Sequence, residues 1–212
     1  MEAIQRSDLP GLFAAWEQVM VDNKQDLIAL DGVMGDGDLG LTMANAFAAA
    51  AAEVAGSAEP DLGTILMKAG MAMAKAAPST MGTLIATGFM RGGKALKDKP
   101  ALAGPELALF LRAFADGLMD RGKSRPGEKT VVDALHPAAL AAEAAAAAGA
   151  GLDQTAAVMA EASATGLEAT IGMLAQHGRA AYYQEKSVGK PDPGATVGCL
   201  LLQSLAQFIH NH

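Results

Sequence analysis

The sequence predicts an all-α protein, a single domain of about eight antiparallel helices, and three observations support this prediction. Aromatic residues make up only 4% of the 212 residues, whereas Ala, Leu and Met are abundant, a balance that favours helices over strands. Apolar residues recur at three- and four-residue spacing, as in amphipathic helices. The breaks between these stretches are short and rich in Gly, Pro and Asp, and none is a linker. We therefore expect one domain over residues 1–212.

Capping residues place the first four predicted helices. Asp8 precedes the first apolar stripe, and Gly56 stops the second helix, which is rich in Ala. Asp61 is suited to cap the third helix, and Ser79 or Thr80 the fourth, because their side-chain oxygens can accept hydrogen bonds from free backbone N–H groups. These helices are expected over residues 8–30, 41–54, 61–73 and 79–96.

Similar signals place the last four helices. Pro105 fits the first turn of a helix. Thr130 with Asp133 resembles a capping box, so we assign Thr130 and Asp133 to capping. Gly149 ends that helix, and Asp153 can start the next. These helices are expected over residues 105–118, 130–148, 153–176 and 195–209. Ala-rich helices can approach closely, which suits either a bundle or a closed ring of helices.

Charge and cysteine content argue against several classes of partner. With 16 basic and 23 acidic residues, the net charge is −7, so the surface would repel nucleic acid and anionic lipid. No stretch has the pattern of a targeting or membrane-spanning segment. The lone Cys199 permits no internal disulfide and fits a reducing compartment. We therefore expect a cytoplasmic protein without nucleic-acid or membrane partners.

Two glycine-rich stretches match phosphate-loop patterns but lack the required context. Residues 117–124 satisfy the Walker A pattern, yet a predicted helix precedes them and Arg-Pro-Gly follows at 125–127, where a helix should continue. We interpret them as a helix end and a surface loop. Residues 35–40 satisfy the dinucleotide pattern G-x-G-x-x-G, but the carboxylates of Asp36 and Asp38 would repel a pyrophosphate unless a cation intervened.

The acids of this second loop form the clearest candidate metal site. Asp31, Asp36 and Asp38 fall within eight residues on a glycine-rich loop between two predicted helices, so three hard oxygen ligands can converge. An EF-hand requires acids at alternating positions and a glutamate at the twelfth, and neither Leu39 nor Thr42 fits that scheme. Because the protein supplies only a few ligands, other coordination positions stay open for water and substrate phosphates, as is usual for Mg²⁺. The alternative is helix capping, with Asp31 near a helix end and Asp38 at an N-cap.

Four motifs occur in the order of one family. They read GDGDLG at 35–40, GEKT with DAL at 127–135, GRAAY at 178–182 and DPGA at 192–195. On these motifs, the chain resembles the nucleotide-binding L subunit of dihydroxyacetone kinase over almost its full length. The resemblance implies a closed barrel of eight helices that holds a nucleotide, ADP or ATP, and two Mg²⁺ ions at one end. It also implies that Asp31, Asp36 and Asp38 hold both ions.

The resemblance implies a set of nucleotide contacts as well. Arg179 matches the family's arginine near the nucleotide, and Met81 is expected to form an apolar wall against adenine. For Ser79 and Thr80, helix capping is as good an interpretation as nucleotide contact. Asp192 is also well placed to cap the last helix. The implied contacts are Leu39, Thr42, Ser79, Thr80, Met81, Gly82, Arg179, Asp192 and Gly194.

The resemblance further implies phosphoryl transfer with partner subunits. This chain would hold the Mg-nucleotide, and a separate K subunit would hold the ketose through a covalent histidine link. In one form of the family ATP is the exchangeable donor, and in the other a phosphocarrier M subunit rephosphorylates bound ADP. Catalysis then consists of positioning and charge neutralisation, and no side chain of this chain acts as a nucleophile.

Two other functions stay open at this point. The chain can be a nucleotide-binding regulatory partner that carries out no transfer of its own. It can also be a purely structural helical bundle, in which the acidic loop supplies only helix caps. Nucleotide binding separates the structural bundle from the other two.

Overall fold

The computed structural model describes residues 1–212 and consists of α-helices, short 3-10 helices and loops. The α-helices are α1 (Leu9–Asp22), α2 (Lys24–Asp31), α3 (Leu39–Ala55), α4 (Leu62–Ala76), α5 (Thr80–Ala95), α6 (Gly104–Gly122), α7 (Val132–Ala147), α8 (Leu152–Ala169) and α9 (Pro193–Asn211). The 3-10 helices are η1 (Arg6–Asp8), η2 (Thr170–Gly172) and η3 (Arg179–Ser187). An isolated β-bridge pairs Ile4 with Leu102. The predicted all-α class is confirmed. No helix combines the length and the apolar character that a membrane span requires.

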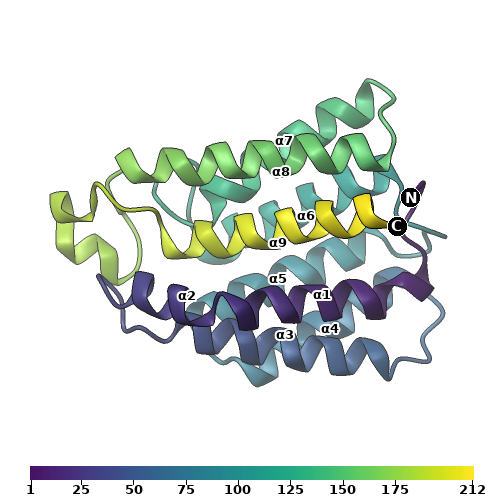
Figure 1. Ribbon diagram of the computed structural model, residues 1–212, viewed down its shortest axis with the longest axis horizontal. Helices are drawn as coiled ribbons and strands as arrows, with labels where there is room; N and C mark the ends of the chain where they lie inside the picture. Colours follow the sequence, from purple (N-terminus) through teal and green to yellow (C-terminus); the bar gives the residue numbers. More distant parts are fainter.

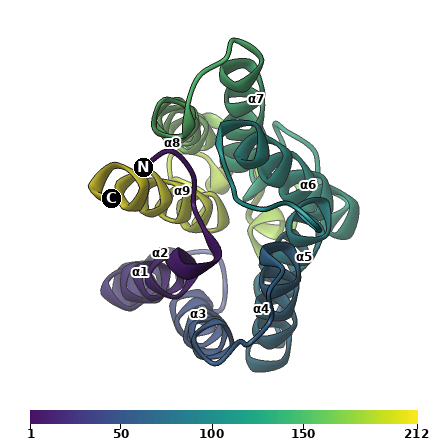
Figure 2. The ribbon, with the colours of Figure 1, turned by 90° about the vertical axis from the view of Figure 1, so that its right-hand side faces the viewer.

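All the α-helices except α2 form a closed ring, which Figure 2 shows end-on. Helix α1 packs against α3, each helix from α3 to α8 packs against the next one along the chain, and α9 returns to α1. Helix α2 extends beyond the end of α1 and packs against α3 and α9. The fold is therefore the closed helical barrel that the family resemblance implied, and not an open bundle.

Neighbouring helices of the ring run in opposite directions, so alternate helices begin at the same end (Figure 1). Helices α3, α5, α7 and α9 begin at the end that also carries the α2–α3 loop and η3, on the left of Figure 1. The chain termini lie at the opposite end, where the amino group of Met1 donates to the Ile209 carbonyl at 3.3 Å.

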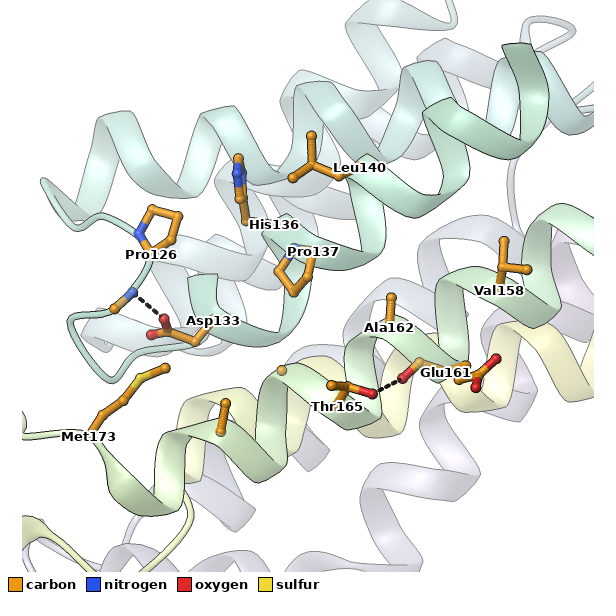
Figure 3. A pocket seen from close by; sticks show the side chains of 13 residues that line it. Pro126, Asp133, His136, Pro137, Leu140, Val158, Glu161, Ala162, Thr165 and Met173 are labelled. Atoms are coloured by element: carbon orange, nitrogen blue, oxygen red, sulfur yellow. Dashed lines mark hydrogen bonds between the residues drawn. The ribbon is translucent and has the colours of Figure 1, made fainter. Parts of the chain in front are cut away.

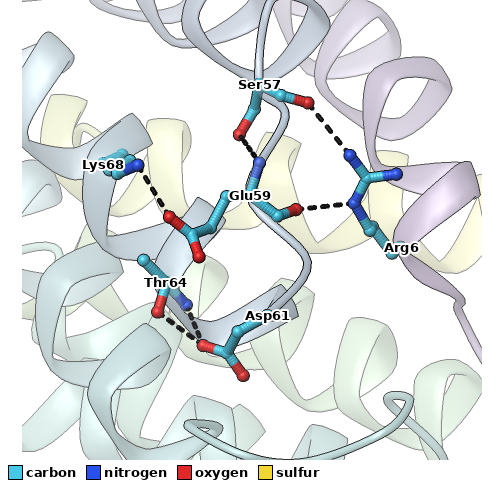
Figure 4. A network of polar contacts seen from close by, with 6 residues as sticks. All are labelled: Arg6, Ser57, Glu59, Asp61, Thr64 and Lys68. Carbon is cyan, nitrogen blue, oxygen red and sulfur yellow. Dashed lines mark hydrogen bonds and ion pairs between the residues drawn. The ribbon is translucent and has the colours of Figure 1, made fainter.

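A polar network fixes the α3–α4 loop at the end that carries the termini (Figure 4). Arg6 donates from Nε to the Glu59 carbonyl at 2.6 Å and from Nη2 to the Ser57 carbonyl at 3.0 Å. Asp61 caps α4, because its Oδ2 accepts a hydrogen bond from the Thr64 N–H at 2.6 Å. The cap predicted at Asp61 is confirmed.

Five of the six phenylalanines and the single tryptophan meet in one aromatic cluster inside the ring. Phe89 of α5 lies at its centre, with ring centroids of the other members 5.2 to 6.1 Å away. The other members are Phe13, Trp16, Phe47, Phe110 and Phe114. The Nε1 of Trp16 donates to the Leu201 carbonyl at 3.0 Å, which joins α1 to α9 where the ring closes. The few aromatic residues are therefore concentrated where four helices of the ring meet.

The prediction of one helix over residues 8–30 is wrong, because the structure has two helices there, α1 and α2, separated at Asn23. The backbone of Asn23 leaves the helical region, with φ −94° and ψ 7°. Its side-chain Nδ2 and its backbone N–H both donate to the Val19 carbonyl, at 2.9 and 3.2 Å. Asn forms hydrogen bonds to nearby backbone groups and favours helix ends, which fits a helix end at this position.

The prediction of a helix over residues 153–176 is also wrong at its C-terminal end. Helix α8 stops at Ala169, and the chain continues through η2 into extended backbone at Met173. The carbonyls of Thr170 and Met173 accept hydrogen bonds from Lys129 Nζ, at 2.7 and 3.3 Å. The Thr170 carbonyl also accepts a hydrogen bond from the Met173 N–H at 3.1 Å, so the first turn after α8 is a 3-10 turn that a side chain from a distant loop contacts.

Phe89→Ala should lower the free energy of unfolding by about 3 to 5 kcal/mol, because it removes the ring that all other members of the cluster contact. Urea denaturation followed by circular dichroism measures the change. The control is Tyr182→Ala, whose side chain is 88% exposed and which should change stability by less than about 0.5 kcal/mol. Equal effects of the two substitutions would contradict the central position of Phe89.

Candidate functional site

The starts of α5, α7 and α9 lie against one another at the end of the ring opposite the termini. A Cβ atom added to Gly194, in the first turn of α9, would lie 3.4 Å from Met81 Cε of α5 and 3.4 Å from Val131 Cβ, which precedes α7. The first turn of each helix has backbone N–H groups without helical partners and carries the positive end of the helix dipole. Together these helix starts favour a bound anion.

The three acids predicted as metal ligands are brought together at this same end. Oxygen atoms of Asp31, Asp36 and Asp38 all lie within 4.8 Å of one another. Asp31 is the last residue of α2, and Asp38 immediately precedes α3. Gly35 allows the loop to fold tightly, because a Cβ at this position would collide with the Asp31 carboxylate. Three carboxylates at this spacing have the geometry of a site for a hard divalent cation.

Helix capping accounts for one of these acids and not for the other two. Asp31 Oδ2 accepts hydrogen bonds from the backbone N–H groups of Asp38 at 3.1 Å and Leu39 at 3.4 Å, so it caps the start of α3 across the loop. Asp38 occupies the N-cap position, but its side chain makes no capping hydrogen bond. Asp36 and Asp38 thus carry carboxylates that the start of α3 does not use.

Among these acids Asp38 has a raised pKa, and the charge of Arg179 acts in the opposite direction. Burial raises the pKa of the Asp38 carboxyl, the charges of Asp36 and Asp31 raise it further, and the charge of Arg179 lowers it. Arg179, the first residue of η3, lies with Nη2 2.7 Å from Asp36 Oδ2. A single guanidinium balances one of three carboxylates, so the cluster keeps negative charge that a cation would neutralise.

The first turns of α3 and α5 hold five more of the predicted contacts. Ser79 Oγ accepts a hydrogen bond from the Gly82 N–H at 3.0 Å, which confirms its capping role. Thr80 is exposed and Thr42 is half-buried. Leu39 is only 6% exposed and packs in the core, so its backbone N–H is the group that it presents to the site. The fifth, Gly82, is buried.

Asp192 is a buried helix cap. It is 8% exposed, and its Oδ2 accepts a hydrogen bond from the Ala195 N–H at 2.7 Å. Burial raises the pKa of Asp192 to about 7, with a further increase from the charge of Asp133; the hydrogen bond to Ala195 and the charge of Lys129 act in the opposite direction. The predicted cap is confirmed, and its carboxyl group is largely removed from solvent.

The structure adds Val131 to this end of the ring, a residue that the sequence did not single out. Its side chain lies beside Met81 and Gly194, so the three residues form one small apolar surface between the starts of α5, α7 and α9. Nothing in the local pattern marks Val131, because it follows a predicted capping residue and reads as ordinary core. Only the meeting of three distant segments reveals it.

Two other features lie outside this arrangement. The Walker A match at 117–124 is the end of α6, as predicted, with Lys123 in the left-handed region after the last helical turn. A groove of about 560 Å³ lies between α7 and α8 and is bordered by Asp133, His136, Glu161 and Thr165, among others (Figure 3). No acid of the α2–α3 loop lines this groove.

Asp192→Asn should remove a pH dependence of stability, because Asn keeps an oxygen for the cap but does not titrate. Below about pH 4, Asp192 is protonated in both states; at higher pH it ionises in the unfolded chain, whereas the folded protein retains the proton until about pH 7. Stability therefore falls as the pH rises through this window. Since one pKa unit corresponds to about 1.4 kcal/mol, the loss relative to the variant reaches about 4 kcal/mol.

Urea denaturation at several pH values between about 4 and 8 measures this difference, with Asp153→Asn at the opposite end of the ring as the control. A constant difference between wild type and Asp192→Asn across this range would contradict the raised pKa.

Comparison with known proteins finds relatives of nearly the same length and longer proteins of which this chain covers about a third. The family model described as DAK2 domain matches residues 33–207. The ADP-binding subunit DhaL of PEP-dependent dihydroxyacetone kinase from Escherichia coli is 29% identical over 204 residues, which are 96% of this chain and 97% of that protein. The corresponding subunit of kinase 1 from Listeria innocua is 34% identical over 188 residues, or 88% of each chain. L-erythrulose 1-kinase from Mycolicibacterium smegmatis is 32% identical over 206 residues, which are 95% of this chain and only 35% of that protein.

Solved structures share the fold. The dihydroxyacetone kinase of C. freundii in its native form superposes with a TM-score of 0.73 and 23% identity, covering 98% of this chain and 36% of that one. The same enzyme in complex with AMP-PNP and Mg²⁺ gives a TM-score of 0.71 and 22% identity. The resemblance drawn from the four sequence motifs is confirmed, since the family model matches most of the ring: this chain belongs to the DAK2 domain family.

Proposed function

We propose that this chain is the nucleotide-binding subunit of a dihydroxyacetone kinase, or of a kinase for a related ketose, and that residues 1–212 act as one nucleotide-binding domain. The observation that carries the proposal is the convergence of Asp31, Asp36 and Asp38 within 4.8 Å at the end of the ring where alternate helices begin. Relatives of nearly equal length are named as ADP-binding subunits of such kinases, which supports the same role here.

In this proposal, Asp31, Asp36 and Asp38 hold two Mg²⁺ ions. Each ion prefers oxygen ligands and keeps positions for phosphate oxygens, so it neutralises charge on the phosphates during transfer. The acids fix where this charge is placed, because Asp31 is itself fixed by hydrogen bonds from the start of α3. Arg179, paired with Asp36, adds a guanidinium whose fork of donors suits phosphate.

The remaining contacts divide between phosphate and base. Thr42, Ser79 and Thr80 offer hydroxyl groups in or beside the first turns of α3 and α5, where Gly82 and Leu39 also lie. The backbone N–H groups of Gly82 and Leu39 already donate to Ser79 Oγ and Asp31 Oδ2, so these two residues shape the site through the caps. Met81 and Gly194, with Val131 between them, offer an apolar surface for adenine. Asp192 acts indirectly, since it caps α9 just before Gly194. No residue is required as a nucleophile, because positioning and charge neutralisation suffice for phosphoryl transfer.

A K-type subunit that holds the ketose is the proposed partner. Exposed large apolar side chains collect in the segments beside the acidic loop, in the α2–α3 region and between α8 and α9. They are Val33, Leu41, Leu174, Tyr182, Tyr183 and Val188, each at least 41% exposed. Exposed apolar residues gathered around a polar site mark protein contact surfaces. A partner at this end would bring its substrate to the phosphates.

The phosphoryl donor is proposed to be a bound nucleotide that is recharged in place. Relatives from Escherichia coli and Lactococcus lactis are named as PEP-dependent and PTS-dependent kinases with an ADP-binding subunit, which supports rephosphorylation by a phosphocarrier M subunit. The other possibility is exchangeable ATP. Mass spectrometry of the protein as purified distinguishes them, since only a recycled ADP should accompany the chain through purification.

Calorimetric titration of ADP and ATP, with and without Mg²⁺, tests nucleotide binding. Wild type stripped of nucleotide should bind only in the presence of Mg²⁺, and Asp36→Asn should weaken this binding at least about tenfold, because it removes a charged oxygen ligand. The matched control is Asp153→Asn, the same change on an exposed acid at the start of α8, which should bind as wild type does. Absence of binding by wild type would favour the purely structural bundle.

Tyr182→Ala separates partner docking from nucleotide binding. Its side chain is 88% exposed, so the substitution should leave Mg-ADP binding unchanged and should lower the rate of phosphoryl transfer to dihydroxyacetone in the presence of a purified K-type subunit. Coupled assays at several concentrations of K subunit measure the rate. Nucleotide binding without any transfer, even with the K subunit, would favour a regulatory partner instead of a kinase subunit.

A further inference from the structure

We propose that Lys129 is a positioning residue for nucleotide binding: its ammonium group holds together the two ends of the segment between α8 and α9 and thereby places Arg179 beside the acidic loop. The inference rests on the proposed function, because it assigns a role to a residue that acts through Arg179.

The contacts of Lys129 span the base of this segment. Its Nζ donates to the carbonyls of Thr170 at 2.7 Å, Met173 at 3.3 Å and Lys190 at 2.7 Å. The first two acceptors follow α8 directly, and the third immediately precedes the approach to α9. A lysine ammonium has three N–H donors, and here each has a backbone acceptor. One side chain therefore closes a segment of about 20 residues at its base.

The burial of Lys129 shows that these bonds replace water completely. The residue is only 2% exposed, and its backbone has a φ of 59°, a left-handed conformation that is unusual for a residue other than glycine. Burial lowers the pKa of Lys129, and the nearby carboxyl of Asp192 opposes this change. A buried ammonium is costly unless it is fully paired, so the three carbonyls must stay in place around it.

Arg179 lies within the segment that this base closes, and its side chain is 65% exposed and pairs with Asp36. The segment has other hydrogen bonds at its base, from the Asp192 N–H to Thr170 Oγ1 at 2.9 Å and from the Ala175 N–H to Ser187 Oγ at 3.0 Å, but their donors are uncharged. Gly189 N–H donates to the Ile171 carbonyl at 2.8 Å beside the Lys129 contacts, and His177 lies 2.6 Å from the carboxylate of Glu128, the neighbour of Lys129. The loop before α7 thus supports both the base of the segment and the turn that leads into η3.

The tip of the segment is held less firmly than its base. Tyr182 is 88% exposed, and Gln184 has a φ of 50° and a ψ of −127°, a strained conformation for a residue with a side chain. Loss of the Lys129 contacts would leave the base of the segment with hydrogen bonds from uncharged donors, such as those from the Asp192 N–H to Thr170 Oγ1 and from the Gly189 N–H to the Ile171 carbonyl. Arg179 would then sample positions away from the acidic loop.

The test is Lys129→Met, which removes the ammonium but keeps an unbranched side chain. Lys123→Met is the matched control, because Lys123 also has left-handed backbone, with a φ of 54°, but is exposed. Cleavage by trypsin after Arg179 and Lys186 should be at least about tenfold faster in Lys129→Met than in wild type or the control. This readout requires no nucleotide, so it tests the position of the segment even if wild type binds no nucleotide, an outcome that would overturn the proposed function alone.

A double-mutant cycle with Arg179→Ala tests whether Lys129 acts through Arg179. Each single variant should weaken Mg-ADP binding by about tenfold, and the double variant should be no more than about twofold weaker than the worse single one. Multiplication of the two effects would overturn the proposal, because it would show that Lys129 acts independently of Arg179. So would unchanged cleavage and binding in Lys129→Met.

Circular dichroism and thermal unfolding show whether each variant folds. If Lys129→Met does not fold, Lys129→Gln, which keeps two N–H donors, is used in the same cycle and should give a smaller increase in cleavage and the same dependence on Arg179. Failure of both variants to fold would assign Lys129 to fold stability alone and would overturn the proposal.

Discussion

Closure of the ring between α1 and α9 is the constraint on which the candidate site depends. When antiparallel helices close into a ring, alternate helices must begin at the same end. The loops that precede α3, α5, α7 and α9 therefore meet, although they are far apart in the sequence. The contact between Trp16 of α1 and the Leu201 carbonyl of α9, inside the aromatic cluster, is where this closure is fixed. The positive ends of these helix dipoles then lie at the same end of the ring as the negatively charged α2–α3 loop.

The two ends of the ring differ in how their polar groups are satisfied. At the end with the termini, the α3–α4 loop is held by exposed or half-buried hydrogen bonds around Arg6 and Asp61. At the other end, Lys129 and Asp192 are buried, and three of the four non-glycine residues with positive φ lie there: Lys123, Lys129 and Gln184. Such strain and buried charge concentrate at functional sites, where geometry matters more than stability.

Local signals in the sequence predicted the acidic loop and several helix caps, but the side chain of Asp8 makes no capping hydrogen bond at the start of α1. Asp61, Ser79 and Asp192 each cap the helix assigned to them, since a cap is decided within three or four residues. The break at Asn23 and the end of α8 were not predicted, because Asn also occurs inside helices and because the segment after α8 is held by a residue that is distant in the sequence. That residue, Lys129, is 41 residues away from Thr170. Ring closure is non-local as well, so composition left it open and only the resemblance to a family indicated it.

The same distinction applies within the candidate site. The convergence of three aspartates was predictable because they share one short loop, but the capping role that the alternative interpretation gave to Asp38 belongs to Asp31. Val131 could not be predicted, because its neighbours Met81 and Gly194 come from helices far along the chain. Residues that share one loop were therefore predictable from the sequence, whereas surfaces formed between separate loops were not.

All three acids of the cluster come from one stretch of eight residues, between the end of α2 and the start of α3. None of them is part of the ring, whose aromatic centre lies among α1, α3, α5 and α6. Asp36 and Asp38 do not cap α3, so a change of either side chain removes no hydrogen bond from the ring. Scaffold and the proposed metal chemistry are therefore separable in evolution: the barrel can be inherited unchanged while two side chains of one short segment change.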